Sequence, residues 1–553
     1  MSEQKHLIKR QVIEFTHRRS LKAQQLQADI SRVYRQRIIP LIDRYCTEVG
    51  EPDRLYRIEC LEVDLGVINT EDLEVDLVAK VSKALLPALK AAIGSQEQGL
   101  GSAGQHSKAA SQLELLVCFA RTGSLPWWAD ASQPRLLDNC LQDLLRHTPD
   151  SLRRVLRALV QEPHSLQRIV CQFDDARLAE IFGLLVPAFE SVLIQGTKTV
   201  LTLLQSSRVA ATCSPTRIRQ STWRAILHVA VLGGPQYDTP EALYRAVLKR
   251  VAADVGTAYD ALIADIQQIV DTDDIHVPGE FKDTLGRLSH DHSREQPPVS
   301  EKMSQQWTQL MAAGGILAGV AEAQRTLAPA DYREMLTALS QLAVAAGLSS
   351  SDAAALIKTF RAARQEEPAP SPPSPAELAL DSSFSDADEL YIENAGLVIL
   401  WPFLGHFFAH VGLLEKKQFK DAAARQRAAG LLQYLATGEA SFPEYLLPLN
   451  KVLCGMEVTE VFDFGAPLAE TEAEECTNLL SAVIAQAPIL REMSLSGFRG
   501  SFLLRHGVLS TRDGAWLLRV ERETYDVVLE RFPWSWEWIK LPWMDAPMRV
   551  EWL

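Results

Sequence analysis

The sequence predicts a mainly α-helical protein with small β elements, an α+β fold in three parts. These parts are an N-terminal strand–helix–strand–helix head, a helical middle and an aromatic-rich C-terminal α+β domain. Apolar residues recur at helical spacing through most of the first half, alternate with polar residues near position 60, and join β-leaning, Trp-rich text at the end of the chain. The chain has 553 residues, 47% of them apolar, which suits roughly two to four hydrophobic cores.

The head is expected to span residues 1–93 and to begin with a short β-leaning stretch at 6–15. A helix follows over 20–49, where apolar side chains keep the i, i+3, i+4, i+7 rhythm of one buried helix face. Pro40 lies inside that rhythm. Because proline has no N–H to donate, it should kink or break the helix there.

Residues 56–68 switch to period two and predict a strand. The apolar phase slips between Cys60 and Leu61, which indicates a bulge or an edge. Asn69 or Thr70 is then expected to cap a second helix that runs to about residue 93.

A linker rich in Gly, Ser and Gln is expected over residues 94–108. It contains a formal GxGxxG pattern at 99–104, but a helix rather than a strand precedes the pattern, so the dinucleotide-binding interpretation is disfavoured. Residues 109–270 are interpreted as a helical hairpin region, interrupted early by the Leu-Pro-Trp-Trp run that ends at Trp128.

Four further segments complete the predicted organisation. Residues 271–303 are interpreted as a polar loop, 304–364 as a helical segment, 365–389 as a Pro-rich acidic linker, and 390–553 as the C-terminal α+β domain. Within that domain a helical part comes first. Three β-leaning stretches follow at 515–521, 536–541 and 548–552.

The charge balance disfavours several functional classes. A net charge of −14 argues against general nucleic-acid binding, which needs Lys and Arg facing phosphates. The charge is uneven, because residues 1–44 are basic and residues 365–415 contain no Lys or Arg. The first residues do not resemble a signal peptide, and no run of about 18 apolar residues predicts a membrane span.

No catalytic, cofactor-binding or metal-binding residue is predicted. The sequence has no P-loop, nucleophile elbow, HExxH helix or EF-hand loop, and none of the eight cysteines forms a CxxC pair. His406 and His410 are four residues apart on an expected helix, but their apolar neighbours favour a packed or rim position over a metal site. We therefore expect a protein that is not an enzyme and needs no cofactor.

Tryptophans gather near the end of the chain, with six of the eleven in residues 516–552. Core packing is expected for Trp516 and Trp543. Trp534, Trp536 and Trp538 alternate, so in a strand they would share one face, and that face could belong to the core or to a partner surface.

A second pair, Trp127 and Trp128, is expected to pack, although it could stack on a ligand ring. The candidate partner-interface residues are therefore Trp534, Trp536, Trp538, Trp552, Trp127 and Trp128.

Several runs of rare residues occur in a fixed order along the chain. In the C-terminal domain they are 394–403, 427–438, 443–444, 449–455, 498–505, 516–521, 525–526, 532–534, 539–544 and 551–552. Nearer the N-terminus they are Leu-Glu-Val-Asp-Leu-Gly at 61–66 and Thr-Gly-Ser-Leu-Pro-Trp-Trp at 122–128. This set resembles the tape measure family of contractile injection systems, the phage-tail-like particles of the antifeeding-prophage type.

The resemblance implies a structural protein that sets the length of the inner tube and lies in the tube lumen. It implies contacts with the inner tube, the baseplate hub and the tube terminator or cap, with an assembly ATPase as a further candidate. It also implies a cytoplasmic stage during assembly, followed by a place inside the particle.

Two alternatives stay open: a baseplate-assembly scaffold or chaperone that does not set length, and a toxin or hydrolase cargo loaded in the tube. A fully helical, extended chain of 553 residues would reach at most roughly 830 Å, and the Pro/Gly breaks shorten that span.

Overall fold

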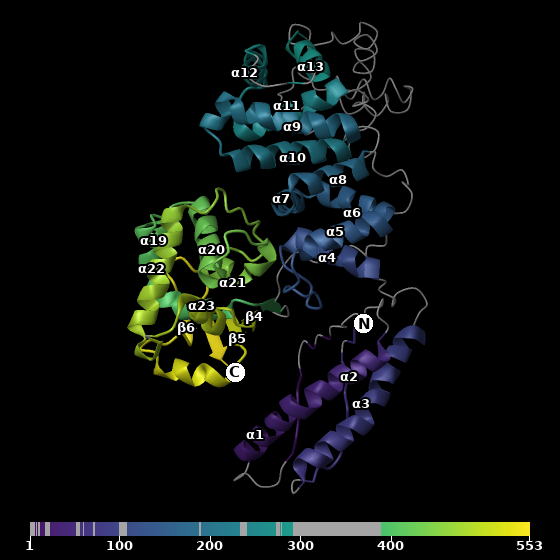
Figure 1. The fold of residues 1–553 in the computed structure, drawn as a ribbon, viewed down its shortest axis with the longest axis vertical. Coiled ribbons are helices and arrows are strands. Elements are labelled where there is room, and N and C mark those ends of the chain that lie inside the picture. Colours follow the sequence, from purple (N-terminus) through teal and green to yellow (C-terminus); the bar gives the residue numbers. More distant parts are fainter. Residues whose placement is uncertain are drawn as a thin grey trace, which may run out of the picture. The chain divides into compact units, whose positions relative to one another are not determined.

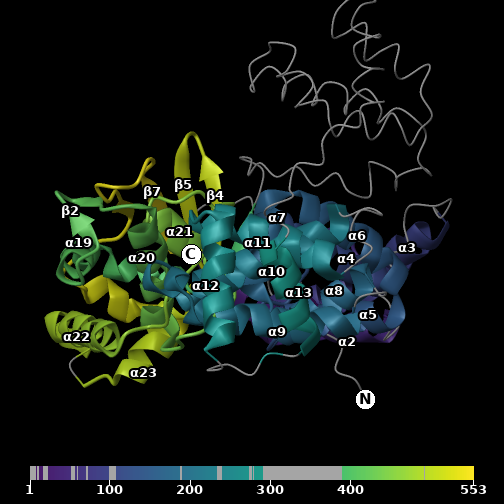
Figure 2. The same cartoon turned by 90° about the horizontal axis from the view of Figure 1, so that it is seen from above.

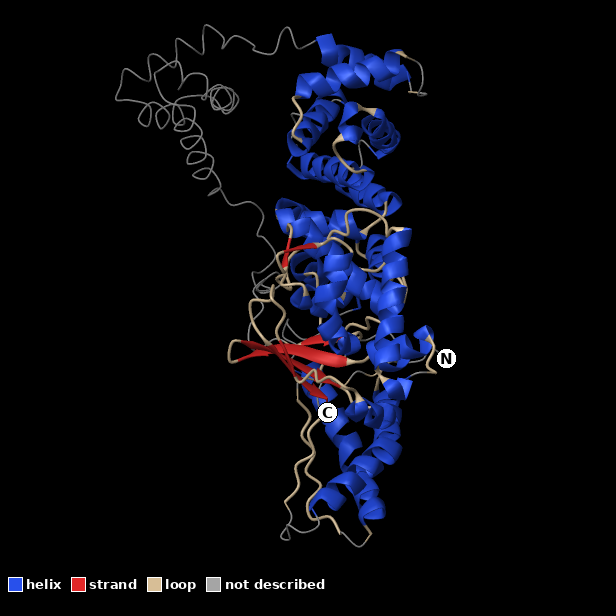
Figure 3. Ribbon diagram, turned by 90° about the vertical axis from the view of Figure 1, so that its left-hand side faces the viewer, coloured by secondary structure: helices blue, strands red, loops and turns tan. Residues whose placement is uncertain are grey.

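The computed structural model describes most of the chain except residues 291–388 and several shorter stretches. The described residues are 6, 8, 11–16, 23–50, 56–58, 60–69, 72–98, 108–186, 190–232, 240–272, 277, 279–290, 389–490 and 492–552. The chain divides into two compact units, one formed by Met1–Thr257 with Asp381–Leu553 and the other by Ala258–Leu380. The expected mainly α-helical fold with small β elements is confirmed, with helices in blue and strands in red in Figure 3.

Helices and one π-helical turn build the head (Figure 1). They are α1 (Ala23–Val33), the π-helix η2 (Tyr34–Ile38), α2 (Ile39–Val49) and α3 (Leu73–Gln98). Pro40 lies in the first turn of α2, and η2 directly precedes that helix. Because proline cannot donate to the α-helical ladder, the ladder changes register just before it, and the expected break at Pro40 is confirmed.

The two strands expected in the head, 6–15 and 56–68, are wrong, since the described residues of both segments form no ladder. The alternation in the second segment nevertheless has a structural counterpart. Leu61, Val63 and Leu65 pack against the head core, and the acidic residues between them are exposed. An extended segment that buries one face without a neighbouring strand gives the same period-two pattern. The period-two pattern therefore reflects burial of one face of this segment and does not indicate pairing with another strand.

The second head helix begins and ends later than expected. It begins at Leu73, so neither Asn69 nor Thr70 directly precedes its first residue. It ends at Gln98, which extends it into the expected linker at 94–108. The GxGxxG pattern at 99–104 lies outside the described residues.

The helical region follows the head. It contains α4 (Lys108–Thr122), α5 (Leu136–His147), α6 (Pro149–Gln161), α7 (Pro163–Gln172), α8 (Asp175–Leu185), α9 (Glu190–Ser206), the 3-10 turn η4 (Arg208–Ala211), α10 (Pro215–Leu232) and α11 (Pro240–Val255). Figure 2 gives a second view of these helices. Helix α10 packs against α6, α7, α8, α9 and α11, so it forms the centre of this region.

Proline sets several of the breaks between these helices. Pro149, Pro163, Pro215 and Pro240 each begin a helix. Proline is favoured in the first helical turn because the N–H that it lacks has no intrahelical partner there. The leucines that recur at helical spacing in α5 and α6 are mostly buried.

The second unit contains α12 (Tyr259–Asp271) and α13 (Gly279–His290), which pack against each other. Helix α13 lies in the stretch 271–303 that was interpreted as a polar loop. Phe281, Leu285 and Leu288 are buried on it, so a sparse apolar face at helical spacing suffices to form this helix. The expected helical segment 304–364 lies outside the described residues, and so does the expected linker 365–389 apart from its last residue.

The C-terminal domain combines short helices with a sheet. Its first half contains β1 (Leu390–Ile392), η7 (Ala395–Leu400), α19 (Trp401–His410), β2 (Leu414–Glu415), β3 (Gln418–Phe419), α20 (Ala422–Thr437), η8 (Glu444–Leu446) and α21 (Pro448–Leu453). Its second half contains α22 (Glu470–Gln486), η9 (Pro488–Leu490), α23 (Leu495–Phe498), the π-helix η10 (Arg499–Leu503), β4 (Gly507–Arg512), β5 (Ala515–Val520), η11 (Thr524–Arg531), β6 (Trp538–Ile539) and β7 (Met548–Trp552).

Five strands form the main sheet in the order β1-β4-β5-β7-β6, with β5 and β7 parallel and the other pairs antiparallel. Two of the expected strands are confirmed, as β5 and β7. The third, at 536–541, is reduced to β6. Sequence patterns gave no sign of β1 and β4, or of the separate two-stranded pair β2–β3. The core lies where the inner face of this sheet meets the domain's helices, and Phe408, Phe498 and Phe502 are fully buried in it.

The glycine at position 396 is predicted to be essential to this core. A Cβ atom added there would lie 1.6 Å from the carbonyl oxygen of Phe502, a backbone atom that cannot move aside easily. We expect Gly396→Ala to lower the free energy of unfolding by roughly 2–3 kcal/mol. Gly405→Ala on α19 is the matched control, because nothing lies within 4 Å of its added Cβ, and it should leave stability unchanged or slightly higher. Tryptophan fluorescence during urea unfolding measures both, and equal effects of the two variants would contradict the prediction.

Candidate functional site

Three charged side chains are buried together where the helical region meets the C-terminal domain. Arg168 lies on α7, Glu444 begins η8, and Lys451 lies on α21. Their side chains are 0%, 6% and 1% exposed, respectively. Burial of charge is unfavourable unless every charge is paired and hydrogen-bonded, so this cluster, the buried junction, needs a full set of partners.

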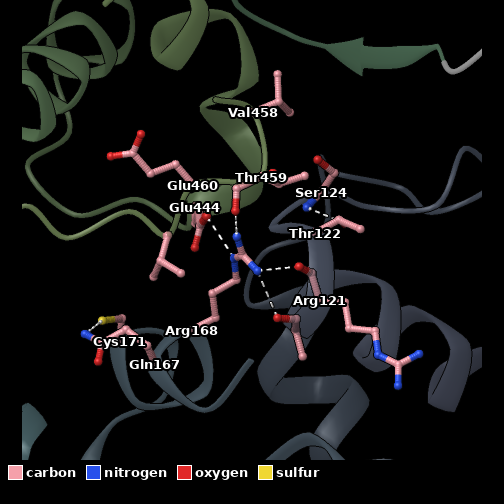
Figure 4. Close-up of polar contacts among 12 residues, drawn as sticks. Arg121, Thr122, Ser124, Gln167, Arg168, Cys171, Glu444, Val458, Thr459 and Glu460 are labelled. Atoms are coloured by element: carbon pink, nitrogen blue, oxygen red, sulfur yellow. Dashed lines mark hydrogen bonds and ion pairs between the residues drawn. The ribbon is translucent and has the colours of Figure 1, made fainter. Parts of the chain in front are cut away.

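The guanidinium of Arg168 has partners on both sides of the junction (Figure 4). Its Nε donates to Glu444 Oε1 at 3.1 Å, and its Nη2 donates to the carbonyl of Thr459. Its Nη1 donates to the carbonyls of Ala120 at 3.1 Å and Arg121 at 2.5 Å. These two carbonyls belong to the last turn of α4, where backbone acceptors have no intrahelical partner and favour a cation.

Lys451 completes the cluster from within the C-terminal domain. Its Nζ donates to Glu444 Oε1 at 2.6 Å and to the carbonyls of Val458 and Glu460 at 2.9 and 2.7 Å. All three ammonium protons therefore have acceptors. Burial lowers the pKa of Lys451, and the adjacent Glu444 carboxylate opposes that shift. One carboxylate thus neutralises part of two buried cations, and backbone carbonyls hold the rest.

Close packing surrounds the charges. Gly123 has a φ of +75°, and a Cβ added there would lie 2.4 Å from Glu444 Oε1, so both its conformation and its lack of a side chain are required. Beside it, Phe119 of α4 meets Tyr445 edge-on, with ring centroids 6.3 Å apart. Burial raises the pKa of Tyr445 to about 12, with nearby carboxylates adding to the shift.

A small crevice borders the junction between the 124–131 turn and strand β1. It is lined by residues that include Trp127, Tyr391 and Tyr445, and its volume is about 40 Å³. That volume admits a water molecule or two but is far below the several hundred Å³ of a typical ligand pocket. The crevice therefore offers no room for a substrate.

Trp127 and Trp128 have different surroundings. Trp128 is half-buried; its Nε1 donates to Glu114 at 3.3 Å, and the guanidinium of Arg57 lies 4.4 Å from the centre of its ring. Arg57 also pairs with Glu114 at 2.7 Å, so Trp128 helps attach the head to α4. Trp127 is 37% exposed. The expected packing applies to Trp128 more than to its neighbour.

The six tryptophans of residues 516–552, here called the closing tryptophans, also divide into internal and exposed residues. Trp534, Trp536 and Trp552 are partly buried against the domain core, and Trp536 meets Trp552 edge-on with centroids 5.7 Å apart. Trp538 is 59% exposed. Of the alternating residues Trp534, Trp536 and Trp538, only Trp538 lies in a strand, so the alternation does not produce one shared strand face.

Hydrogen bonds confirm the internal role of three indoles. Trp534 Nε1 donates to the carbonyl of Ile399 at 3.0 Å, and Trp552 Nε1 donates to Asp526 Oδ2 at 2.8 Å. Trp543 is buried as expected and donates to the carbonyl of Leu453 at 2.8 Å. Trp516 is half-buried against the same core.

Asp526 links Trp552 to a second buried ion pair. Its two oxygens accept from Arg505 at 2.6 and 2.7 Å, and Oδ2 also accepts from the backbone N–H of Glu523 at 2.7 Å. Burial opposes ionisation of Asp526, but the hydrogen bonds from Arg505, Glu523 and Trp552 outweigh it. The pKa of Asp526 therefore lies below its usual value.

Sequence reasoning did not single out Arg168, and it included Glu444 and Lys451 only within the runs 443–444 and 449–455, without assigning either a role. A signal existed for two of them, since Glu444 and Lys451 are charged residues within a largely apolar run from 442 to 454. Buried charges in such runs are usually paired. Arg168 follows a polar residue on an amphipathic helix, and nothing in its neighbours distinguishes it from a surface arginine.

The described residues show no grouping of three or more His, Cys, Asp or Glu side chains that could hold a metal ion. The rings of His406 and His410 stack with centroids 6.3 Å apart, and His410 Nε2 lies 3.4 Å from Glu475. No helix in the described part of the chain combines the length and the apolar character needed to cross a bilayer.

Comparison with known proteins identifies one family. A model of the contractile injection system tape measure protein family matches residues 5–552. No curated protein and no solved structure matches the chain.

Glu444→Gln is expected to destabilise the protein strongly. The change leaves Arg168 and Lys451 buried without a counter-charge, which should lower the free energy of unfolding by about 3–5 kcal/mol. Glu530→Gln is the matched control, because Glu530 pairs with Arg522 at the surface and its loss should cost less than about 0.5 kcal/mol. Urea unfolding of the full chain measures both. A loss below about 1 kcal/mol for Glu444→Gln, which is the range of an exposed ion pair, would contradict the buried junction.

Asp526 predicts a specific dependence on pH. Its folded-state pKa is below the unfolded value of about 3.9, so its contribution to stability is present above that pH and is lost as the pH falls through the folded-state pKa. Asp526→Asn should therefore be less stable than the wild type at pH 7. The difference in the free energy of unfolding between the two proteins should become smaller at acid pH. Unfolding free energies at about pH 7, 5 and 3 test this. A constant gap would show that Asp526 does not titrate as proposed.

Proposed function

The chain belongs to the contractile injection system tape measure family, and from this premise we propose how it acts in the particle. It is a structural protein that sets the length of the inner tube, and it lies within the injection particle. We propose that it occupies the tube lumen and contacts the inner tube, the baseplate hub and the tube terminator, with an assembly ATPase as a further candidate. The family match across nearly the whole chain carries this proposal.

Among the described residues, the exposed tryptophans Trp127 and Trp538 are the best candidates for partner contacts. Trp127 and Trp538 offer large aromatic surfaces of the kind that anchor protein interfaces. Trp534, Trp536 and Trp552 pack against the domain core, and Trp128 packs against Arg57, so these four side chains are engaged within the chain. We therefore propose that only part of the predicted tryptophan set touches a partner directly.

The buried junction limits how the folded chain can measure length. Arg168 and Glu444 are 276 positions apart in the sequence, yet their side chains are in contact. While that contact holds, the residues between them begin and end at the same place and add nothing to the distance between the chain ends. We propose that the chain measures length in an extended state, in which the buried junction is open.

An in-frame deletion of residues 258–380 tests the length role. The deletion removes the second compact unit and leaves every residue of the buried junction in place. At about 1.5 Å per helical residue, an extended ruler should lose up to roughly 180 Å, so the inner tube should become shorter by that order. Electron microscopy of purified particles measures the length.

Duplication of the same residues is the matched control, and it should lengthen the tube by a similar amount. Particles of unchanged length from both variants would contradict the ruler. Absence of the chain from purified particles would favour an assembly scaffold instead.

A further inference from the structure

The tip of the β2–β3 hairpin has an unusual pair of residues. Leu414 pairs with Phe419 and Glu415 with Gln418, which leaves Lys416 and Lys417 as a two-residue turn. Both lysines have a positive φ, +50° and +65°. This geometry is typical of the type I′ turn, whose two central positions strongly prefer Asn-Gly or Asp-Gly because side chains with a Cβ are strained there.

The same domain contains a turn with the preferred residues. Asp513 and Gly514 join β4 to β5, and both have a positive φ. One tight hairpin of this domain therefore uses the Asp-Gly pair that its turn geometry favours. Two lysines in the same geometry accept strain without any gain to the turn, which indicates that their side chains serve another purpose.

The hairpin is held firmly at its base. The Phe419 ring lies 4.9 Å from that of Trp543 and 5.6 Å from that of Phe408, both of which are buried. Gln418 Nε2 donates to the carbonyl of Pro542 at 2.9 Å. Figure 2 shows β2 beside α19. The two lysines are therefore presented by a supported turn rather than by a free loop.

The charges at this tip have no partner within the described chain. Lys416, Lys417 and Lys420 are all exposed, and none of them forms an ion pair with another described residue. They stand out in a chain whose net charge is −14. We name residues 414–420 the lysine hairpin.

We propose that the lysine hairpin docks on a carboxylate-bearing surface of another protein of the injection particle. Lysine ammonium groups are compact charges that suit clustered carboxylates, and steering by such charges acts locally even on an acidic protein. The acidic balance of the whole chain disfavours a nucleic-acid partner. The particle as the setting rests on the proposed function.

Two variants separate the strain from the charge. Lys416→Asn with Lys417→Gly relieves the strained turn and removes both charges, whereas Lys416→Gln with Lys417→Gln removes the charges and keeps the strain. The Asn-Gly variant of the full chain should raise Tm by roughly 2–4 °C. Both variants should lower the yield of assembled particles roughly fivefold, because two exposed ion pairs with the partner are lost.

Arg512→Gln is the matched control, because Arg512 is an exposed cation at the end of the other hairpin and its loss should leave the yield unchanged. Carbodiimide treatment of wild-type particles should join Lys416 or Lys417 to a carboxylate of a second protein, as read by mass spectrometry.

Three outcomes would each overturn the proposal. They are a wild-type particle yield from the glutamine variant, a Tm below wild type for the Asn-Gly variant, and cross-links only to carboxylates of the same chain. Failure of the ruler is seen separately, as unchanged tube length in the deletion variant. The few particles that the lysine variants form should have normal length.

Discussion

Arg168 and Lys451 are two cations with no access to water, and Glu444 is the carboxylate they share. Removal of Glu444 leaves two uncompensated charges in the interior, so the two cations can persist there only with that carboxylate. The surrounding structure follows from that requirement. The end of α4 supplies carbonyls, the 458–460 turn supplies more, and Gly123 leaves room for Glu444. The helical region and the C-terminal domain are joined by electrostatic necessity as well as by packing.

The junction also explains why three separate sequence runs belong to one pattern. Gly123 lies in the run 122–128, and Glu444 and Lys451 lie in the runs 443–444 and 449–455. These runs meet at a single buried site, where each residue type is constrained by charge, conformation or space. The three runs therefore build one buried junction. The family resemblance based on these runs has a physical basis in that junction, in addition to the match between sequences.

A tape measure must reach across a distance, whereas this fold brings residues far apart in the sequence into contact. The two properties are compatible if the junction belongs to a closed state of the chain and the ruler to an open one. Most of the tryptophans of residues 516–552 pack against or within the core of the C-terminal domain, and three of them donate their indole N–H to groups inside it. The lysine hairpin and Trp538 are among the described parts of this domain that remain exposed.

Local sequence determined the helices of the middle region, the prolines that begin them, the break at Pro40, and strands β5 and β7, because helical spacing and alternation depend on neighbours within a few residues. Local sequence did not determine which segments pair as strands or which tryptophans are buried. Residues 56–68 alternate without a partner strand, and the closing tryptophans divide into buried and exposed residues that look alike in sequence. Only the tertiary structure shows that Arg168 pairs with Glu444. The two residues are 276 positions apart, so the sequence near either one contains no pattern that indicates the other.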